Sequence, residues 1–340
     1  MASDLAIAKR ATDRINILNM VLMLISALAA FLWPFYLFLI AYAVLGPLHY
    51  LTEISWLHDR RYFTSRKRDY LFLVVATLIY AGSLVPHFAL PQLVANAVII
   101  AFCASIALVL TQDLRWRWLV AVAGTILLFA IPITFSVVVT SLLLVTVIHV
   151  FFFTGCFIFY GSLKSASLTG YASGVLFLAL AMVMFIVTPM PGGGIADAFV
   201  VQHYDKAFGD LNIWFLRTFH LSTAGASASD PFEFSPGATA VMRFIAYAYL
   251  YHYLNWFSKT KIIRWHEVSK ARLGSVVGLW ILAVALYAFD YDIGLKALFF
   301  LSALHVVLEF PLDLRTLIGI GSELTKRIRP RELSAGKTSN

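Results

Sequence analysis

Residues 118–160 read WLVAVAGTILLFAIPITFSVVVTSLLLVTVIHVFFFTGCFIFY and contain no Lys, Arg, Asp or Glu. One helix that crosses the hydrocarbon core of a bilayer needs about 20 predominantly apolar residues. This stretch is long enough for two crossings, and Pro132 is the only proline inside it. The whole chain of 340 residues is 61% hydrophobic and 13% charged, whereas soluble domains carry roughly 25% charged residues. The sequence therefore predicts a polytopic membrane protein and excludes a soluble enzyme or a nucleic-acid-binding module.

Apolar segments of similar length recur on both sides of this stretch. We expect a single transmembrane domain over residues 1–340, an all-α bundle of about ten spans. The expected spans are 16–33, 35–57, 70–88, 91–111, 117–134, 136–160, 170–189, 238–258, 273–289 and 293–312. The outer loop 190–237 contains an amphipathic stretch, Ala207–Leu221, which we expect to lie across the outer mouth as an interfacial helix. Residues 326–340 read as a basic, flexible tail.

The positions of the basic residues predict the orientation of these spans. With the N-terminus inside, 22 of the 26 Lys and Arg residues fall on the cytoplasmic side, where such residues accumulate. The remaining four lie on the outer side: Lys206, Arg217, Arg243 and Lys296. We therefore expect both termini in the cytoplasm and the protein in a bacterial inner membrane. This inside placement accounts for the net charge of +8 without a nucleic-acid partner, and the basic runs can also contact the headgroups of membrane lipids.

Ionisable side chains inside the expected spans are the strongest functional signal. A charged residue at the centre of a membrane helix costs about 2.5–3.5 kcal/mol on insertion scales, and such residues usually serve a function. Those well inside the expected spans are Glu53, Glu309, His49, His149, His252 and His305. Both glutamates follow a histidine by four residues, in HYLTE (49–53) and HVVLE (305–309). Residues at this spacing share one helix face, so the imidazole and the carboxylate can approach the same atom.

Depth along the helices groups these residues further. At about 1.5 Å per residue, the two His–Glu pairs and His252 fall at one level near the cytoplasmic side. We expect His49, Glu53, His252, His305 and Glu309 to be metal ligands, because helical bundles build metal sites from His and Glu of facing helices. Residues that would orient these ligands from behind are His149, Tyr249 and Asn255.

The His–Glu pairs allow three interpretations. Imidazole and carboxylate ligands together suit iron, zinc or manganese. The same groups could form a proton relay in a secondary transporter, which is the alternative function we retain. They could also be structural hydrogen bonds that set the helix register, in which case Glu53→Gln and Glu309→Gln would lower stability and change nothing else.

The patches at His49–Glu53, Tyr251–Trp256 and His305–Glu309 resemble the histidine-motif integral membrane oxygenases, in particular the bacterial Brp/Blh group of β-carotene dioxygenases. The HxxxH and HxxHH boxes of desaturases are missing from the sequence. The resemblance implies that His49, His252 and His305 are iron ligands and that the substrate is soluble in lipid. The sequence thus favours a membrane metalloenzyme, an iron-dependent oxygenase or related oxidoreductase with one or two ions, and favours zinc less.

Overall fold

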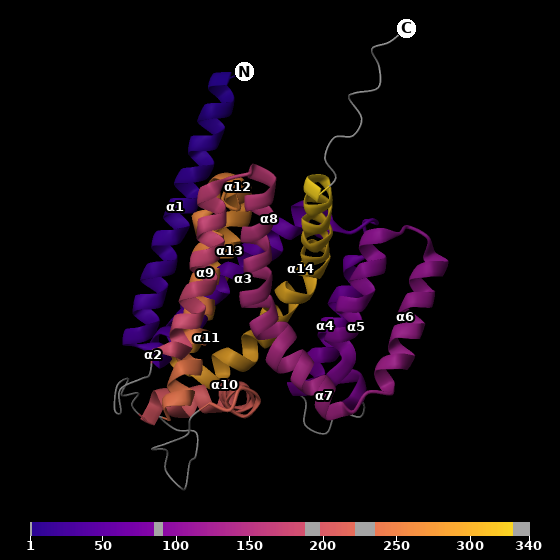
Figure 1. Ribbon diagram of the computed structural model, residues 1–340. Helices are drawn as coiled ribbons and strands as arrows, with labels where there is room; N and C mark the ends of the chain where they lie inside the picture. Colours follow the sequence, from indigo (N-terminus) through magenta and orange to yellow (C-terminus); the bar gives the residue numbers. More distant parts are fainter. Residues whose placement is uncertain (1, 85–90, 188–197, 222–234, 329–340) are drawn as a thin grey trace.

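The expected all-α architecture is confirmed by the computed structural model, which describes residues 2–84, 91–187, 198–221 and 235–328. Every regular element in these ranges is a helix (Figure 1). The α-helices are α1 (Ala2–Leu32), α2 (Pro34–Ile40), α3 (Gly46–Asp59), α4 (Tyr70–Ala81), α5 (Pro91–Leu110), α6 (Leu114–Phe129), α7 (Ile133–Val137), α8 (Thr154–Ser165), α9 (Leu168–Ile186), α10 (Ala198–Thr218), α11 (Pro236–Ser258), α12 (Thr260–Ile263), α13 (Lys270–Phe289) and α14 (Tyr291–Ile328). Two segments are π-helices, η1 (Ala41–Leu45) and η4 (Val138–Phe153), and two are 3₁₀-helices, η2 (Arg61–Phe63) and η3 (Gly82–Leu84).

Seven helical stretches among the described residues are long and apolar enough to cross a membrane. They are Lys9–Leu32, Pro34–Asp59, Gln92–Leu110, Leu144–Ser165, Leu168–Ile186, Lys270–Phe289 and Tyr291–Ile328. Each overlaps one of the expected spans. The protein is therefore an integral membrane protein by the length and composition of its helices, while the count of ten spans stays a prediction.

Three of the expected spans have no counterpart among these seven stretches. In the segment expected at 70–88, the described apolar helix Tyr70–Leu84 is shorter than a span. The segment expected at 117–134 forms α6, which has 16 residues and ends before Pro132. Proline cannot continue a helix at that point because its ring fixes φ and removes a donor. The segment expected at 238–258 forms α11, which has 23 residues and a mixed polar and apolar sequence.

Helix α11 lies in the centre of the bundle, and this position explains its composition. Its residues are buried from Gly237 to Tyr253, Arg243 and His252 included. A helix surrounded by protein needs no lipid-facing apolar stripe, so it tolerates polar residues that hydropathy penalises. Its aromatic side chains pack against neighbouring helices; the Tyr247 ring, for example, lies 6.0 Å from that of Phe177 on α9. The central helix is therefore well suited to present polar groups inside the bundle.

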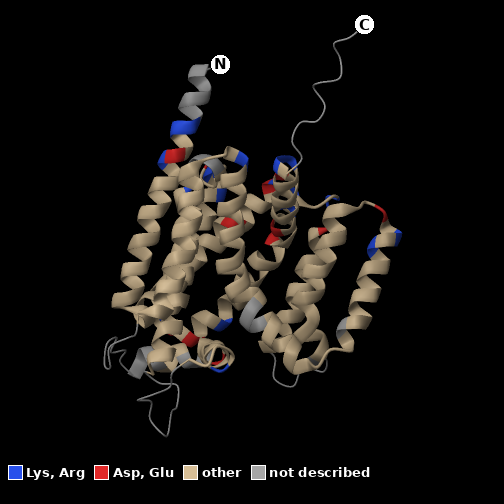
Figure 2. Cartoon of the chain, in the orientation of Figure 1, with Lys and Arg blue, Asp and Glu red and all other residues tan. Residues whose placement is uncertain are grey.

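The two ends of the bundle differ in charge. The start of α1 and the end of α14 lie at the same end of the bundle (Figure 1). Figure 2 shows that most Lys and Arg residues gather at this end. Helix α10 covers much of the stretch Ala207–Leu221 and lies across the opposite end, as an interfacial helix would (Figure 1). The remainder of the expected loop 190–237 and of the tail 326–340 falls largely outside the described residues.

Helix α14 changes direction part-way along its length (Figure 1). Pro311 lies inside this helix, where it removes a backbone hydrogen bond and bends the chain. The residues around the bend are buried, including His305, Glu309 and Asp313. The bend therefore lies in the part of the helix that carries its buried polar groups.

Candidate metal centre

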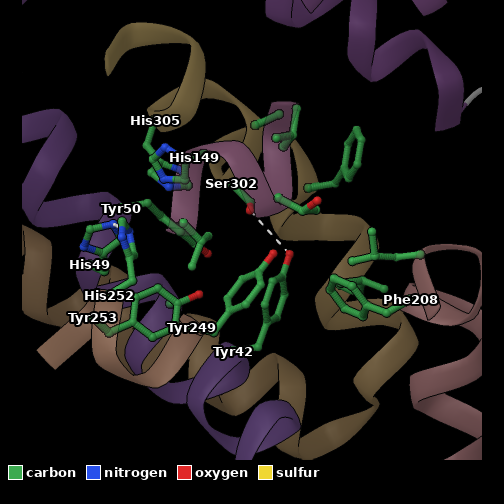
Figure 3. A pocket seen from close by; sticks show the side chains of 18 of the residues that line it. Tyr42, His49, Tyr50, His149, Phe208, Tyr249, His252, Tyr253, Ser302 and His305 are labelled. Atoms are coloured by element: carbon green, nitrogen blue, oxygen red, sulfur yellow. Dashed lines mark hydrogen bonds between the residues drawn. The ribbon is translucent and has the colours of Figure 1, made fainter. Parts of the chain in front are cut away.

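Four histidines from four different segments meet inside the bundle (Figure 3). They are His49 on α3, His149 on η4, His252 on α11 and His305 on α14. Their exposed fractions are 1, 2, 8 and 6%. The ring centroids of His49 and His252 are 4.6 Å apart, and the ring of His149 lies 5.0 Å from His252 and 5.1 Å from His305. The four rings therefore form one compact cluster, which we call the histidine cluster.

The nitrogen atoms of this cluster are spaced as metal ligands are. Nε2 of His252 lies 2.9 Å from Nε2 of His49. Two nitrogens bound at about 2.0–2.1 Å and at right angles around one ion are about 2.9 Å apart. One ligand atom each of His49, His149 and His305 also lie within 4.8 Å of one another. The three buried histidines can therefore hold a metal ion, and His252 adjoins them through its contact with His49.

Two ring nitrogens of the cluster are buried without a protein partner in the described part of the chain. They are Nδ1 of His49 and Nε2 of His149. An unpaired polar atom in the interior costs free energy comparable to a lost hydrogen bond, about 1–3 kcal/mol. A bound ion or its water ligands would satisfy these atoms, so the donor set fits a metal.

Glu53 and Glu309 border the cluster, but only Glu53 approaches the histidine that helix periodicity predicts for it. Oε2 of Glu53 lies 3.0 Å from Nε2 of His49, its neighbour at i−4. Oε2 of Glu309 instead lies 3.2 Å from Nδ1 of His149, which belongs to another segment. His149 is therefore not behind the other histidines, where we expected it, but among them and beside a carboxyl group.

A third acid, Asp313, accompanies these two and was not anticipated. Its side chain is fully buried on α14, and neither carboxyl oxygen has a hydrogen-bond partner among the described residues. The carboxyl groups of Glu53 and Glu309 share a hydrogen bond, and Asp313 lies near enough for its charge to act on Glu53. The tenth span expected from the sequence ends at residue 312, one position before Asp313. The repeated four-residue step from His305 through Glu309 to Asp313 is the signal that would have found it.

Thr154 is a second residue that sequence reasoning missed. Its Oγ1 lies 2.9 Å from Nδ1 of His252, in the buried interior. A hydrogen bond to one imidazole nitrogen fixes the ring and directs the other nitrogen towards a metal. No pattern in the sequence links residues 154 and 252, because the contact depends on how η4, α8 and α11 pack together.

The residues expected to orient the ligands fall in different places. Tyr249 lies one turn before His252 on α11 and lines a cavity that adjoins the histidines. Asn255 faces another side of the helix, where its Oδ1 lies 3.5 Å from the hydroxyl of Tyr251. The hydroxyl of Tyr251 also donates to Oδ1 of Asn19 on α1, at 3.3 Å. Asn255 therefore belongs to a helix–helix contact.

Two local features of the backbone place the ligands. The π-helix η1 leads into Gly46 and Pro47, which open α3 one turn before His49. A Cβ at Gly46 would lie only 3.2 Å from the Tyr253 hydroxyl, so the absence of a side chain allows α3 and α11 to approach closely. His149 itself lies in the π-helix η4, a rare conformation that is frequent at functional sites.

A cavity of about 310 Å³ adjoins the histidine cluster on the side away from the carboxyl groups. All four histidines contribute to its wall, together with five tyrosines: Tyr42, Tyr50, Tyr80, Tyr249 and Tyr253. The hydroxyls of Tyr42 and Ser302 lie 3.4 Å apart, and Figure 3 shows this pair beside the space. The cavity reaches the exposed residues Asp210 on α10 and Ser83 on η3. This cavity, with its aromatic wall and polar hydroxyls, thus leads from the histidines towards the α10 end of the bundle.

No protein-family model matches this sequence, and searches of curated proteins and of solved structures find no significant match. The function is therefore argued from the geometry of the site.

Proposed function

We propose that the protein is an integral membrane metalloenzyme, an iron-dependent oxygenase or related oxidoreductase that acts on a lipid-soluble substrate. The observation that supports this proposal most strongly is the 2.9 Å separation of two imidazole nitrogens that belong to different helices, within a cluster of four buried histidines. Neutral imidazoles with a neighbouring carboxylate are typical ligands of non-haem iron, while zinc is the less favoured choice.

The histidine cluster and Glu53 would hold the ion. A ferrous ion there would supply the electrons that activate dioxygen. The residues around the ion would have two roles. Thr154 fixes the ring of His252, and the largely aromatic wall of the cavity would guide a substrate to the cluster.

The composition of the cavity wall supports the proposal that the substrate is apolar. Its wall combines tyrosine rings with Val145, Val150, Leu295 and Phe299, and its hydroxyls offer hydrogen bonds at only a few points. Sites for small molecules typically have this character, apolar walls with a few polar groups that fix orientation. The resemblance to the Brp/Blh group agrees with a lipid-soluble substrate. We place the enzyme in a bacterial inner membrane, with both termini in the cytoplasm, in contact with membrane lipids and without a nucleic-acid partner.

A proton relay in a transporter is the second candidate, and one observation favours it. The histidine cluster lines the cavity and contacts Glu53 and Glu309, and the charge of Asp313 acts on Glu53. Such chains of His and acidic residues carry protons in pumps and transporters. The relay interpretation needs no metal, so metal content separates the two functions.

The test is the metal content of the detergent-purified protein, measured by mass spectrometry. The enzyme proposal predicts near-stoichiometric iron in the wild type and its loss in His49→Ala and His305→Ala. His220→Ala is the matched control, because His220 is exposed and lies outside the cluster. Protein that folds without metal and takes up none when iron is added would contradict the proposal and favour the relay.

A further inference from the structure

We propose that a layer of hydroxyl side chains beside the histidine cluster binds the oxygen atom of a neutral alcohol or carbonyl compound, and that this largely apolar compound is the substrate. The residues of this hydroxyl layer are Tyr42, Thr146, Tyr249 and Ser302. The inference deepens the proposed function and rests on it for the role of the bound compound as a substrate. Sequence reasoning considered only Tyr249 among these residues, as a side chain that orients a metal ligand.

The hydroxyl layer follows the histidine cluster segment by segment. Each cluster histidine is preceded along its helical stretch by one residue of the layer, three positions earlier for Thr146, Tyr249 and Ser302 and seven for Tyr42. The four stretches all run from the α10 end of the bundle towards the basic end (Figure 1). A residue three positions earlier shares a helix face with its histidine and lies about 4.5 Å closer to the α10 end. All four residues of the layer line the cavity.

Two hydroxyls of the layer lie close enough to bind one ligand atom together. Oη of Tyr42 and Oγ of Ser302 are 3.4 Å apart, which is longer than the usual O–H···O distance of about 2.5–3.0 Å. The ring of Tyr249 lies 6.0 Å from that of Tyr42, and Figure 3 shows both hydroxyls on the side of Ser302. A hydroxyl has one donor and two acceptor sites. The long contact between Tyr42 and Ser302 therefore leaves capacity for a ligand oxygen that bonds to both.

The charge of the cavity wall favours a neutral ligand. Among the described residues that line the cavity there is no Lys or Arg, and their one acid, Asp210, is exposed on α10. A buried carboxylate or phosphate is costly without a cationic partner, so the wall does not suit a fatty acid or a phospholipid headgroup. A plain hydrocarbon does not suit it either, because it would cover the hydroxyls and leave them without hydrogen bonds.

Tyr50 provides a further polar group in the wall, next to the histidines. It is 4% exposed, and its hydroxyl has no hydrogen-bond partner among the described residues. Its ring lies 5.7 Å from that of His305, and the residue lines the same cavity. Buried polar groups are almost always hydrogen-bonded. The unpaired hydroxyl of Tyr50 thus supports a polar ligand atom, or a water molecule that accompanies it, close to the histidine cluster.

The test measures ligand competition on full-length, metal-stripped protein in lipid nanodiscs. The probe is a photoreactive diazirine derivative of dodecanol, and mass spectrometry quantifies its crosslinking to the protein. The competitors share one chain length and differ in their polar group: dodecanol, 2-dodecanone, dodecane and dodecanoate. We expect the alcohol and the ketone to compete about 10-fold more strongly than the hydrocarbon and the carboxylate, which is the effect of one or two hydrogen bonds.

Tyr42→Phe combined with Ser302→Ala removes two hydroxyls and keeps the aromatic ring. In this double variant, dodecanol and dodecane should compete within about 2-fold of each other, because the hydrogen bonds are lost. Tyr291→Phe is the matched control and should keep the wild-type preference, since the hydroxyl of Tyr291 donates to the carbonyl of Leu39 and the residue does not line the cavity. Should the double variant not elute as folded protein, Tyr42→Phe alone replaces it and should lower the preference about 3-fold.

Equal competition by dodecane and dodecanol in the wild type would overturn the proposal, as would a preference for dodecanoate or a preference that survives in the double variant. Absence of specific crosslinking would also overturn it and would favour a water-filled cavity, as in a proton relay. The assay does not depend on iron, because the protein is stripped of metal. An alcohol preference in protein that takes up no iron would support the hydroxyl layer and contradict the enzyme proposal. Iron binding without the preference would overturn the hydroxyl layer and leave the enzyme proposal standing.

Discussion

Nε2 of His252 lies 2.9 Å from Nε2 of His49, although 203 positions separate the two residues in the chain. Two imidazole nitrogens at this distance cannot both present lone pairs to each other. Either one carries a proton that it donates to the other, or both bind the same ion. The ligand atoms of His149 and His305, which lie within 4.8 Å of one another and of His49, favour the ion.

Thr154 is the residue that we expect to set the orientation of His252. Thr154→Val keeps the shape of the side chain and removes the hydroxyl that meets Nδ1 at 2.9 Å. Loss of such a partner behind a ligand typically lowers metal affinity about 10- to 100-fold. A competition titration with a chelating dye measures the change. Thr154→Ser retains the hydroxyl and should bind like the wild type; equal affinity in the valine variant would show that His252 is not held through Thr154.

Gly170 and Gly174 give a matched pair of predictions for helix packing. A Cβ at Gly170 would lie 2.6 Å from Oγ and 3.2 Å from the backbone Cα of Ser162, whereas at Gly174 the nearest atom, on Ile158, is 3.7 Å away. Gly170→Ala should therefore push α8 and α9 apart and cost about 1–3 kcal/mol in the free energy of unfolding. Gly174→Ala should be tolerated. Unfolding in mixed detergent micelles measures both, and equal effects would contradict the close approach.

The buried ion pair between Arg117 and Asp69 should contribute strongly to the stability of the α4–α6 region. Nη1 of Arg117 lies 2.6 Å from Oδ1 of Asp69, and both side chains are 8% exposed. Arg117→Met would leave an uncompensated buried carboxylate, at a cost of about 3–5 kcal/mol. The more exposed pair of Arg272 and Asp59 is the comparison, where loss of the ion pair itself costs about 0–1 kcal/mol. Similar unfolding midpoints for Arg117→Met and the wild type would refute the prediction.

Cysteine labelling tests the orientation of the bundle and the opening of the cavity together. In a variant with Cys103 and Cys156 replaced by alanine, Ser83→Cys and Asp210→Cys should react in intact cells with a maleimide that cannot cross the membrane. Both positions are exposed and line the cavity. Lys67→Cys is the control from the basic end and should react only after permeabilisation. The reverse pattern would place the termini outside.

The local part of the site could be predicted from the sequence, since it depends only on helix periodicity. The spacing of HYLTE places Glu53 beside His49, and the structure has this contact at 3.0 Å. The partner of Glu309 could not be predicted in this way. His149 reaches it from the π-helix η4, a separate segment of the chain, and no helical spacing links residues 149 and 309.

The number of spans shows the same limit for the fold. Apolar length identified the helices that face lipid, such as α9 and α13. Apolar length is a weaker guide to α11, because burial on all sides permits polar residues in that helix. It is also a weaker guide to α4 and α6, because these helices are shorter than the expected spans. Asp313 was missed for a related reason. The expected span ends just before this acidic residue, whereas its side chain is fully buried in the bundle.

The most direct test of the histidine cluster is X-ray absorption at the metal edge of the purified, metal-loaded protein. The account predicts nitrogen or oxygen neighbours at about 2.0–2.2 Å, with the multiple-scattering pattern of at least three imidazole rings, and a clear loss of that pattern in His305→Ala. A spectrum with no imidazole scattering, unchanged by His305→Ala, would mean that the ion binds elsewhere and would contradict the metal centre.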